Sequence, residues 1–431
     1  MTMLIKNALI VNAAGEASEI QDILIEKGRI AAIGKGLSGR GVKVIDAGGK
    51  KVLPGLIDIH AHLREPGQEE KETIETGSRA AAHGGFTTVF CMPNTRPAID
   101  NAEIVEAVKA EARRVGLVNV IPIGAVTKGQ QDQELVDMFE MRAAGCLALS
   151  DDGKSVNNSQ LMLLAMKYAQ MARVLLIQHC EDPLLSRKGV MNEGYQSTVL
   201  GMRGDPAPSE TVILARDIEL SAYLKIPLHF AHLSLRRSCD LVRRAKADGI
   251  PVTAECCPHH FTLTEEAVAG FDANTKVNPP LRSADDVEAL KEALADGTLD
   301  CIATDHAPHS REDKERGFDG APPGMSGFET AFGLAMTELV HTKVLTLAQL
   351  TDKMSHSPAR LMGLETKGEI AEGRDADLVI VDPDEEWTVD TADFYSKGKN
   401  SPFAGRRLKG RVRVTICGGK VVYDGNGKRG T

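Results

Sequence analysis

Short apolar runs alternate with amphipathic stretches through the middle of the chain. Eight apolar runs of strand length lie between residues 54 and 365, at 55–59, 87–92, 118–126, 146–150, 173–178, 227–231, 251–256 and 299–304. Apolar positions recur with helical period between them, as in 101–116, 132–145 and 284–297. Eight strands alternating with helices are typical of a (β/α)8 barrel. A doubly wound open sheet is the alternative, although no G-x-G-x-x-G motif follows any of the runs.

Both ends of the chain have a different pattern. Strand-like runs broken by glycine fill residues 1–53 and recur in 366–431, and neither segment has a helical period. We therefore predict an α/β protein with a (β/α)8 TIM-like barrel at 54–365. The barrel is inserted into a small β-sandwich domain that both chain ends (1–53 and 366–431) form together, and the segment 369–382 starts the return to it.

Composition narrows the range of partners and compartments. A net charge of −9, one Trp and five Tyr argue against nucleic-acid binding, because phosphate contacts need basic residues and base stacking needs aromatic ones. The eight cysteines include no C-x-x-C pair, and several lie in apolar runs, which indicates reduced thiols. We find no signal-peptide pattern and no apolar run of the ~20 residues that a membrane span needs, so we expect a soluble cytoplasmic protein.

Metal-type side chains follow five of the eight apolar runs. His60 and His62 alternate at the end of the first run, so they project to one face of a strand, although an H-x-H pair alone is a weak signal. The other runs lead into Asp151 and Asp152, His179, His232, and Asp305. In a barrel, the carboxyl ends of all strands meet at one face. This set of imidazoles and carboxylates suits Zn2+ or a similar divalent ion, and it is large enough for two ions.

Several motifs in order along the chain resemble those of a known family. PGLIDIHAHLREPG (54–67), MPNT (92–95), HCED (179–182), HLS (232–234) and ATDHAPH (303–309) are similar to motifs of the cyclic amidohydrolases in the amidohydrolase superfamily. The likeness is greatest to the class I dihydroorotases of bacteria, and it covers essentially the whole chain. It implies reversible hydrolysis of L-dihydroorotate to N-carbamoyl-L-aspartate, an early step of de novo pyrimidine (UMP) biosynthesis.

The resemblance also assigns metal ligands. It implies that His60 and His62 hold one ion and that His179 and His232 hold the other. Asp152, rather than Asp151, aligns with the bridging aspartate, 27 residues before His179. Many members of the superfamily bridge the ions with a carboxylated lysine, which this strand end lacks. The expected cofactor is Zn2+, with one or two ions per chain and two favoured.

Asp305 would be the catalytic residue as well as a metal ligand. The expected mechanism has a metal-activated hydroxide attack the ring amide, with Asp305 as general acid and base. The structural alternative for Asp305 is a helix N-cap.

Substrate contacts follow from the same resemblance. Arg64, Asn94 and His309 are expected to hold the substrate carboxylate, for which a guanidinium fork is well suited. The whole expected substrate set is His62, Arg64, Asn94, Asn278, His309, Pro323 and Gly324. Arg64 could instead be a surface arginine, and both asparagines could be turn residues. The polar, glycine-rich stretch 309–330 is predicted to be a loop over the site and a candidate lid.

Other functions and partners stay open at this point. Hydantoinase and allantoinase open similar cyclic amides, and some related chains are non-catalytic partners of aspartate carbamoyltransferase. The filled ligand positions argue against a purely non-catalytic role. We expect a small-molecule substrate and a homodimer, with association with aspartate carbamoyltransferase as a further option. His259 and His260 lie near the predicted site but are given no ligand role, and His83, His341 and His356 are predicted to be surface or packing residues.

Overall fold

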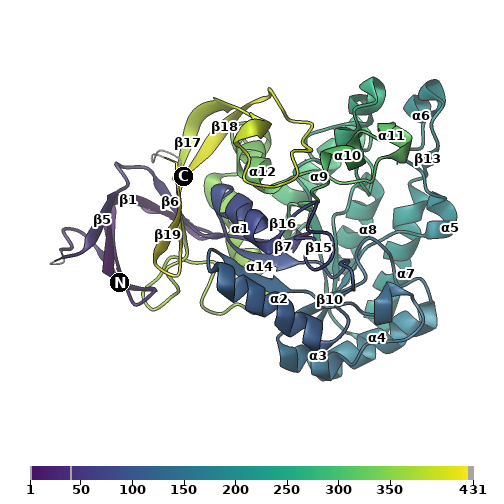
Figure 1. Cartoon of the computed structure of the whole chain (residues 1–431), viewed down its shortest axis with the longest axis horizontal. Coiled ribbons are helices and arrows are strands. Elements are labelled where there is room, and N and C mark those ends of the chain that lie inside the picture. Colours follow the sequence, from purple (N-terminus) through teal and green to yellow (C-terminus); the bar gives the residue numbers. More distant parts are fainter. Residues whose placement is uncertain (1, 39–40, 426–431) are drawn as a thin grey trace.

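The computed structural model describes residues 2–38 and 41–425, and its larger part is a closed barrel of parallel strands (Figure 1). Three strands pair in the order β7-β8-β9 and five in the order β10-β11-β14-β15-β16. Parallel bridges Gly124–Leu149 and Ala61–His306 join these two groups at both edges. The sheet therefore closes on itself, which confirms the predicted barrel and excludes the open sheet.

The barrel strands coincide with the eight apolar runs of the sequence. Strands of a parallel barrel are covered on both faces, so they form mainly apolar runs rather than an alternating pattern, and β7 is buried at every position. The strands are β7 (Leu56–Ala61), β8 (Phe86–Cys91), β9 (Asn119–Pro122), β10 (Ala148–Ser150), β11 (Leu175–Gln178), β14 (Leu228–Phe230), β15 (Val252–Cys256) and β16 (Cys301–Ile302).

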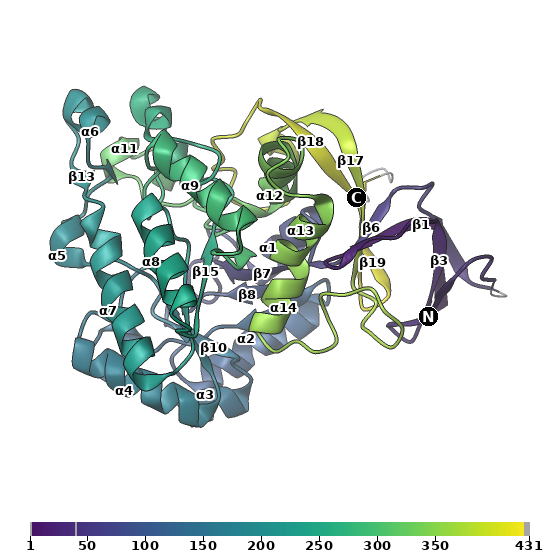
Figure 2. The same cartoon turned by 180° about the vertical axis from the view of Figure 1, so that it is seen from behind.

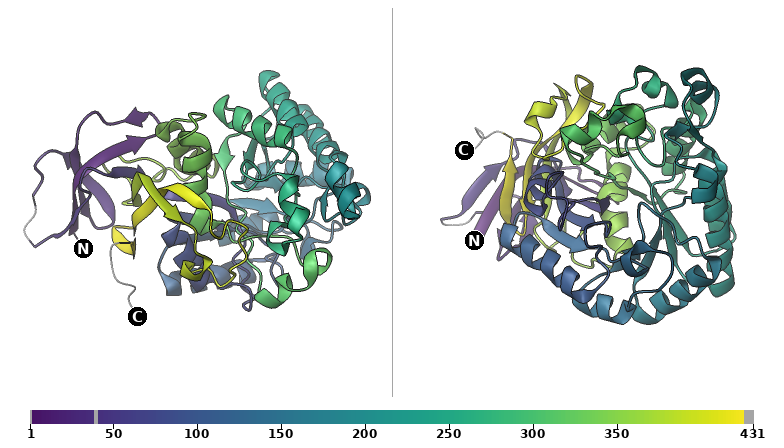
Figure 3. Two further views of the ribbon diagram at one scale, coloured as in Figure 1. Left: turned by 90° about the horizontal axis from the view of Figure 1, so that it is seen from above. Right: turned by 45° about the vertical axis from the view of Figure 1, so that its right-hand side comes forward.

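Helices surround the barrel strands, as the right-hand view of Figure 3 shows. The longer ones are α1 (Ile74–His83), α2 (Ala102–Val115), α3 (Met138–Ala144), α4 (Ser159–Ala172), α7 (Pro208–Leu224), α8 (Arg236–Ala247), α9 (Ala284–Ala295) and α12 (Phe328–Ala335). Shorter helical turns are α5 (Pro183–Ser186), α6 (Tyr195–Leu200), α10 (Arg311–Lys314), α11 (Gly317–Gly320), α13 (Leu347–Thr351) and α14 (Ser357–Leu361). Their apolar faces and the outer faces of the strands form the main hydrophobic core.

One predicted helix is shorter than its sequence pattern. The amphipathic stretch 132–145 forms a helix only from Met138, because the Asp137 side chain accepts hydrogen bonds from the backbone N–H groups of Phe139 and Glu140 and caps the helix there. Upstream, the Asp132 carboxylate accepts backbone hydrogen bonds from Asn157 and Asn158, which holds this segment against the next loop. The expected helix over the first half of this stretch is therefore wrong.

The two chain ends share one sheet with the order β19-β18-β17-β6-β1-β3-β4. The N-terminal strands are β1 (Thr2–Asn12), β2 (Gly15–Glu16), β3 (Gln21–Glu26), β4 (Arg29–Gly34), β5 (Lys43–Asp46) and β6 (Lys51–Pro54), and the C-terminal strands are β17 (Leu378–Thr388), β18 (Arg407–Cys417) and β19 (Lys420–Asp424). Antiparallel pairing of β6 with β17 joins the two ends, as the purple and yellow ribbons of Figure 1 show. The β domain from both termini is thus confirmed. Its limits at residues 53/54 and 365/366 stay a prediction, and residues 1, 39–40 and 426–431 lie outside the described residues.

The β domain packs on one side of the barrel. Helix α13 contacts β1, and the neighbouring α14 contacts β7 (Figure 2). The apolar residues of the two sheet halves, such as Ile5, Ile23 and Ile380, form a core of their own. No helix in the part of the chain that the structure describes has both the length and the apolar character needed to cross a membrane.

Candidate active site

The six predicted metal ligands lie at the carboxyl ends of five barrel strands. His60 is in β7 with His62 just beyond it, and Asp152, His179, His232 and Asp305 follow β10, β11, β14 and β16 within three residues. All six side chains are nearly inaccessible to solvent. Closure of the barrel therefore gathers into one small region six residues that lie between positions 60 and 305 of the sequence.

Asp152 lies at the centre of this cluster. Its Oδ1 atom is 3.2 Å from His60 Nε2, 3.4 Å from His179 Nδ1 and 3.5 Å from His232 Nε2. Its Oδ2 atom is 3.4 Å from His62 Nε2. One carboxylate thus faces all four imidazoles, which is the position that a bridging ligand needs.

Asp151 has a different environment. Its Oδ1 accepts hydrogen bonds from the backbone N–H groups of Val126 (2.8 Å) and Thr127 (3.1 Å), and its Oδ2 accepts from the Thr127 hydroxyl. Both oxygens are therefore occupied by protein donors of the preceding loop. The geometry supports Asp152 rather than Asp151 as the bridging residue.

Asp305 and the remaining histidines complete the cluster. Asp305 Oδ1 lies 3.0 Å from His62 Nε2 and 3.7 Å from His60 Nε2, and His179 Nδ1 lies 2.8 Å from His232 Nε2. Two triads, His60–His62–Asp305 and His60–Asp152–His232, each bring their ligand atoms within 4.8 Å of one another.

The hydrogen bonds of the rings show whether a cation fits. His60 Nδ1 donates to Glu255 Oε1 (2.8 Å) and His62 Nδ1 donates to Asn94 Oδ1 (2.8 Å). In a neutral ring, each Nε2 would then direct a lone pair at the carboxylate of Asp152. His60 Nε2 and Asp152 Oδ1 are both buried and have no hydrogen-bond partner among the described residues, although they face each other. Two lone pairs that face each other repel, so a proton or a metal ion must lie between these two atoms. The donor set suits a divalent cation.

The pKa values of the buried carboxylates and imidazoles are shifted by their mutual contacts. Burial would raise the pKa of Asp152, but the charge of His60 and the nearby imidazoles of His179 and His232 hold it well below its usual range. Burial would lower the pKa of His179, but its contacts with the Asp152 and Glu181 carboxylates outweigh burial and raise this pKa to about 10. The carboxylates are ionised at neutral pH, and the site attracts positive charge.

Two glutamates that the sequence analysis missed orient the imidazoles: Glu255, which is buried, and Glu181, which is partly exposed. Glu255, in β15, accepts from His60 through Oε1 and lies 3.2 Å from His229 Nε2 through Oε2. Glu181 Oε2 is 3.1 Å from His179 Nε2, which leaves Nδ1 of that ring facing Asp152. An acidic residue inside the apolar strand VTAEC is an unusual position that could have signalled Glu255. Its partner is 195 positions away, so the pairing itself is not visible in the sequence.

We expect Glu255→Gln to weaken Zn2+ affinity by about 10–100-fold, the usual effect of losing a carboxylate that supports a metal-binding imidazole. Glutamine keeps the shape of the side chain but loses the charge that polarises His60. The measurement is competition for Zn2+ with a chromophoric chelator. Glu210→Gln is the matched control, because Glu210 is an equally buried acid that binds Ser234 and Ser238 and none of the six predicted ligands. Equal affinity in wild type and Glu255→Gln would contradict the orienting role.

Three of the predicted site residues have strained backbones. Arg64 (φ 63°), His232 (φ 32°) and Asp305 (φ 45°) lie in the left-handed region, which residues with a Cβ rarely adopt. Such strain costs on the order of 1–3 kcal/mol per residue and is typical of functional sites. Buried Asp58 stabilises one of these turns, because it accepts hydrogen bonds from the backbone and hydroxyl of Thr304, next to Asp305.

Arg64 is buried beside the metal cluster and is not a surface residue. Its Nε donates to the Pro308 carbonyl (3.1 Å), and its Nη2 lies 3.3 Å from His309 Nε2. His309 Nε2 donates to the Pro323 carbonyl (2.8 Å). Burial and the positive charges of Arg64, Lys314 and Lys71 lower the pKa of His309, so its imidazole is neutral. The positive charges of Arg64, Lys314 and Lys71 favour an anion on this side of the cluster.

The remaining predicted contact residues border the same region. Asn94 Oδ1 accepts a hydrogen bond from His62 Nδ1, and Asn278 Nδ2 donates to Glu181 Oε2 (2.8 Å). Gly324 has φ 132°, and a Cβ there would lie 2.7 Å from the Ala307 carbonyl oxygen, so only glycine fits. The structure brings all the predicted site residues into one region, whereas their individual roles stay predictions.

Four further histidines lie outside the predicted ligand set. His83 pairs with Glu329 (2.7 Å) and His341 Nε2 donates to the Pro383 carbonyl, which are packing interactions away from the cluster. His259 and His260 are fully buried beyond the end of β15.

Comparisons with known proteins agree on one family. A family model described as "Dihydro-orotase-like" matches residues 49–238, and one described as "Amidohydrolase family" matches residues 266–423. The chain is 53% identical to the dihydroorotase of Pelotomaculum thermopropionicum over 98% of both chains. It is 50% identical to that of Caldanaerobacter subterraneus subsp. tengcongensis over 99% of both chains. Among solved structures, the L-hydantoinase of Arthrobacter aurescens is 28% identical with a TM-score of 0.87, covering 98% of this chain and 96% of the other.

Proposed function

This chain belongs to the dihydroorotase family of amidohydrolases, and from this premise we propose that it interconverts L-dihydroorotate and N-carbamoyl-L-aspartate. The observation that carries the proposal is the position of Asp152, which faces four imidazoles at strand ends beside a buried arginine. This arrangement combines metal-type donors with a counter-charge for a carboxylate. A cyclic amide that bears a carboxylate matches both parts, and L-dihydroorotate is such a molecule.

We propose that His60, His62, His179, His232, Asp152 and Asp305 hold one or two Zn2+ ions. When bound, Zn2+ supplies Lewis acidity, which lowers the pKa of a water molecule and polarises a carbonyl oxygen. Glu255 and Glu181 keep the imidazoles oriented toward Asp152. Asp152 supplies negative charge at the centre of the set.

Asp305 is the proposed proton carrier. During ring opening, its carboxylate takes a proton from the attacking water as the new C–O bond forms at the ring carbonyl. It returns that proton to the ring nitrogen as the C–N bond breaks, so no proton is gained or lost by the residue. In the reverse direction the same carboxylate accepts the nitrogen proton. The strained backbone of Asp305 fixes its carboxylate against His62.

Arg64, Asn94 and His309 are the proposed contacts of the substrate carboxylate, with Asn278 and the backbone of Pro323 and Gly324 against the ring. Because His309 Nε2 already donates to the Pro323 carbonyl, a carboxylate at this nitrogen must replace that hydrogen bond. The segment 309–330 holds α10, α11 and the start of α12, so the prediction of a plain loop is wrong, and its closure as a lid stays a prediction. Lys276 and Lys314 donate hydrogen bonds to backbone carbonyls of this segment and of Ala273.

We expect Arg64→Lys to raise KM for L-dihydroorotate by about 10–100-fold with a smaller change in kcat, because one ammonium cannot replace a two-pronged, charge-assisted contact. Steady-state kinetics measure both constants. Arg79→Lys is the matched control, since Arg79 is exposed and pairs with Glu75 on its own helix. An unchanged KM would remove Arg64 from carboxylate binding.

Substrate choice tests the proposed reaction as a whole. The purified protein is assayed with L-dihydroorotate, hydantoin and allantoin at equal concentration. The proposal requires that L-dihydroorotate is turned over with the highest kcat/KM. Preference for hydantoin or allantoin would indicate a hydantoinase or an allantoinase instead. If none of the three compounds were hydrolysed, a non-catalytic partner of aspartate carbamoyltransferase would be favoured.

The compartment and the assembly are further proposals. All eight cysteines are free and buried, which supports a reducing compartment such as the cytoplasm. A homodimer and an association with aspartate carbamoyltransferase stay predictions, and light scattering with and without that enzyme tests them.

A further inference from the structure

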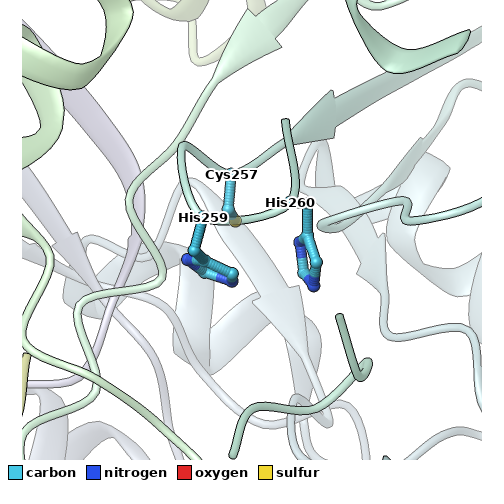
Figure 4. A group of neighbouring side chains, drawn as sticks. All are labelled: Cys257, His259 and His260. Carbon is cyan, nitrogen blue, oxygen red and sulfur yellow. The ribbon is translucent and has the colours of Figure 1, made fainter. Parts of the chain in front are cut away.

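A second group of metal-type side chains lies directly after β15. Cys257, His259 and His260 extend from one short loop and project to the same side (Figure 4). Their ligand atoms all lie within 4.8 Å of one another, and the three residues are at most 3% exposed. None of them belongs to the six predicted ligands of the active site. A thiol and two imidazoles this close together are a donor set that Zn2+ prefers.

Two buried nitrogen atoms of this group have no hydrogen-bond partner among the described residues. They are His259 Nε2 and His260 Nδ1. His260 Nε2 lies 2.9 Å from the Pro279 carbonyl oxygen, which can only accept, so this nitrogen carries the proton. His260 Nδ1 therefore has a free lone pair. An unsatisfied buried polar atom destabilises a protein, and two such atoms in adjacent residues call for a shared explanation.

The ionisation of the two rings is compatible with a ligand role. Burial lowers the pKa of His259 to about 4 and that of His260 well below its usual range. Both rings are therefore neutral at neutral pH, and no proton competes for their lone pairs. The Pro279 carbonyl fixes the tautomer of His260, as backbone carbonyls commonly do for metal-binding histidines.

We propose that Cys257, His259 and His260 form a separate Zn2+ site with Cys257 Sγ, His259 Nε2 and His260 Nδ1 as ligands. On binding, the Cys257 S–H bond breaks, its proton is released to solvent, and the sulfur and the two nitrogens each donate an electron pair to the ion. No oxidant or reductant takes part. The charges of Asp305, His232 and His60 act on His259, so the proposed site lies beside the active site. The ion shares no ligand with the active site, and it stabilises the loop that follows β15.

Cobalt substitution tests this proposal by a signal that the active-site ligands cannot give. The metal-free full-length protein is titrated with Co2+ alone, and the near-ultraviolet band of thiolate-to-Co2+ charge transfer is recorded. We expect the band in wild type and its loss in Cys257→Ser. Cys256→Ser is the matched control, because Cys256 is the adjacent buried thiol and packs in the apolar core. Cys180→Ser is a second control, because Cys180 adjoins His179.

The band should persist in both control variants. Its absence from wild type, its persistence in Cys257→Ser, or its loss in Cys180→Ser would overturn the proposal. His260→Gln keeps Cys257 intact and should weaken Co2+ affinity, measured by this band, at least 10-fold. Its far-ultraviolet circular dichroism spectrum should be unchanged. The test therefore does not depend on the folding of one variant. L-dihydroorotate turnover, followed in parallel, reports on the proposed function independently of the band.

Discussion

Asp152→Asn should reduce kcat/KM for L-dihydroorotate by at least about 1,000-fold, because it removes the charge that faces all four imidazoles, and metal ions contribute several kcal/mol to such reactions. The same variant should lose most of the Zn2+ bound at the active site. Asparagine is nearly isosteric, so the change isolates charge from shape. Metal content and initial rates measured on one preparation test both effects.

Asp151→Asn is the matched control for this prediction. Asp151 is the neighbouring buried acid, but its oxygens bind Val126 and Thr127 rather than imidazoles. We expect this variant to lose stability while it retains its metal. If both variants lost metal equally, or if Asp152→Asn kept wild-type metal and rate, Asp152 would not be the bridging ligand.

Asp305→Asn should lower kcat by about 100- to 10,000-fold with little change in KM, because an amide cannot accept and return the proton. Metal content separates the two roles assigned to this residue. If the proton role dominates, the variant retains most of its metal while kcat falls.

Asp300→Asn serves as the control for Asp305, since Asp300 lies just before the same strand and binds Lys246 and the backbone of Ala254. It should leave kcat unchanged. A loss of metal in proportion to the loss of kcat in Asp305→Asn would reduce Asp305 to a ligand only.

The barrel was predictable because its strands are buried on both faces. Each apolar run is bounded by polar residues, and the donor residues His60, His179 and His232 stand where the runs end. Alternation of strands and helices then places those strand ends on one face of the barrel, so the residues of the site can be predicted from the sequence. The start of α3 was not predictable from apolar period alone, because a single cap at Asp137 decided it.

The supporting contacts of the site depend on tertiary structure. Glu255 reaches His60 only because β15 and β7 are brought together by barrel closure, and their separation of 195 residues leaves no local pattern. The residue types alone do not distinguish Asp151 from Asp152, because both are buried acids in the same turn, and only the family resemblance favoured Asp152. It is decided by the direction of their side chains, which Val126 and Thr127 fix for Asp151. The left-handed backbones of Arg64, His232 and Asp305 likewise have no signal in residue type.

The central claim is that a metal centre built around Asp152 hydrolyses L-dihydroorotate, and one titration tests it most directly. The chelated protein is titrated with Zn2+ while turnover of L-dihydroorotate is followed. We expect no turnover in the chelated protein and recovery that saturates once the active-site ions are bound. Full turnover by the metal-free protein, or none after Zn2+ has bound, would contradict it.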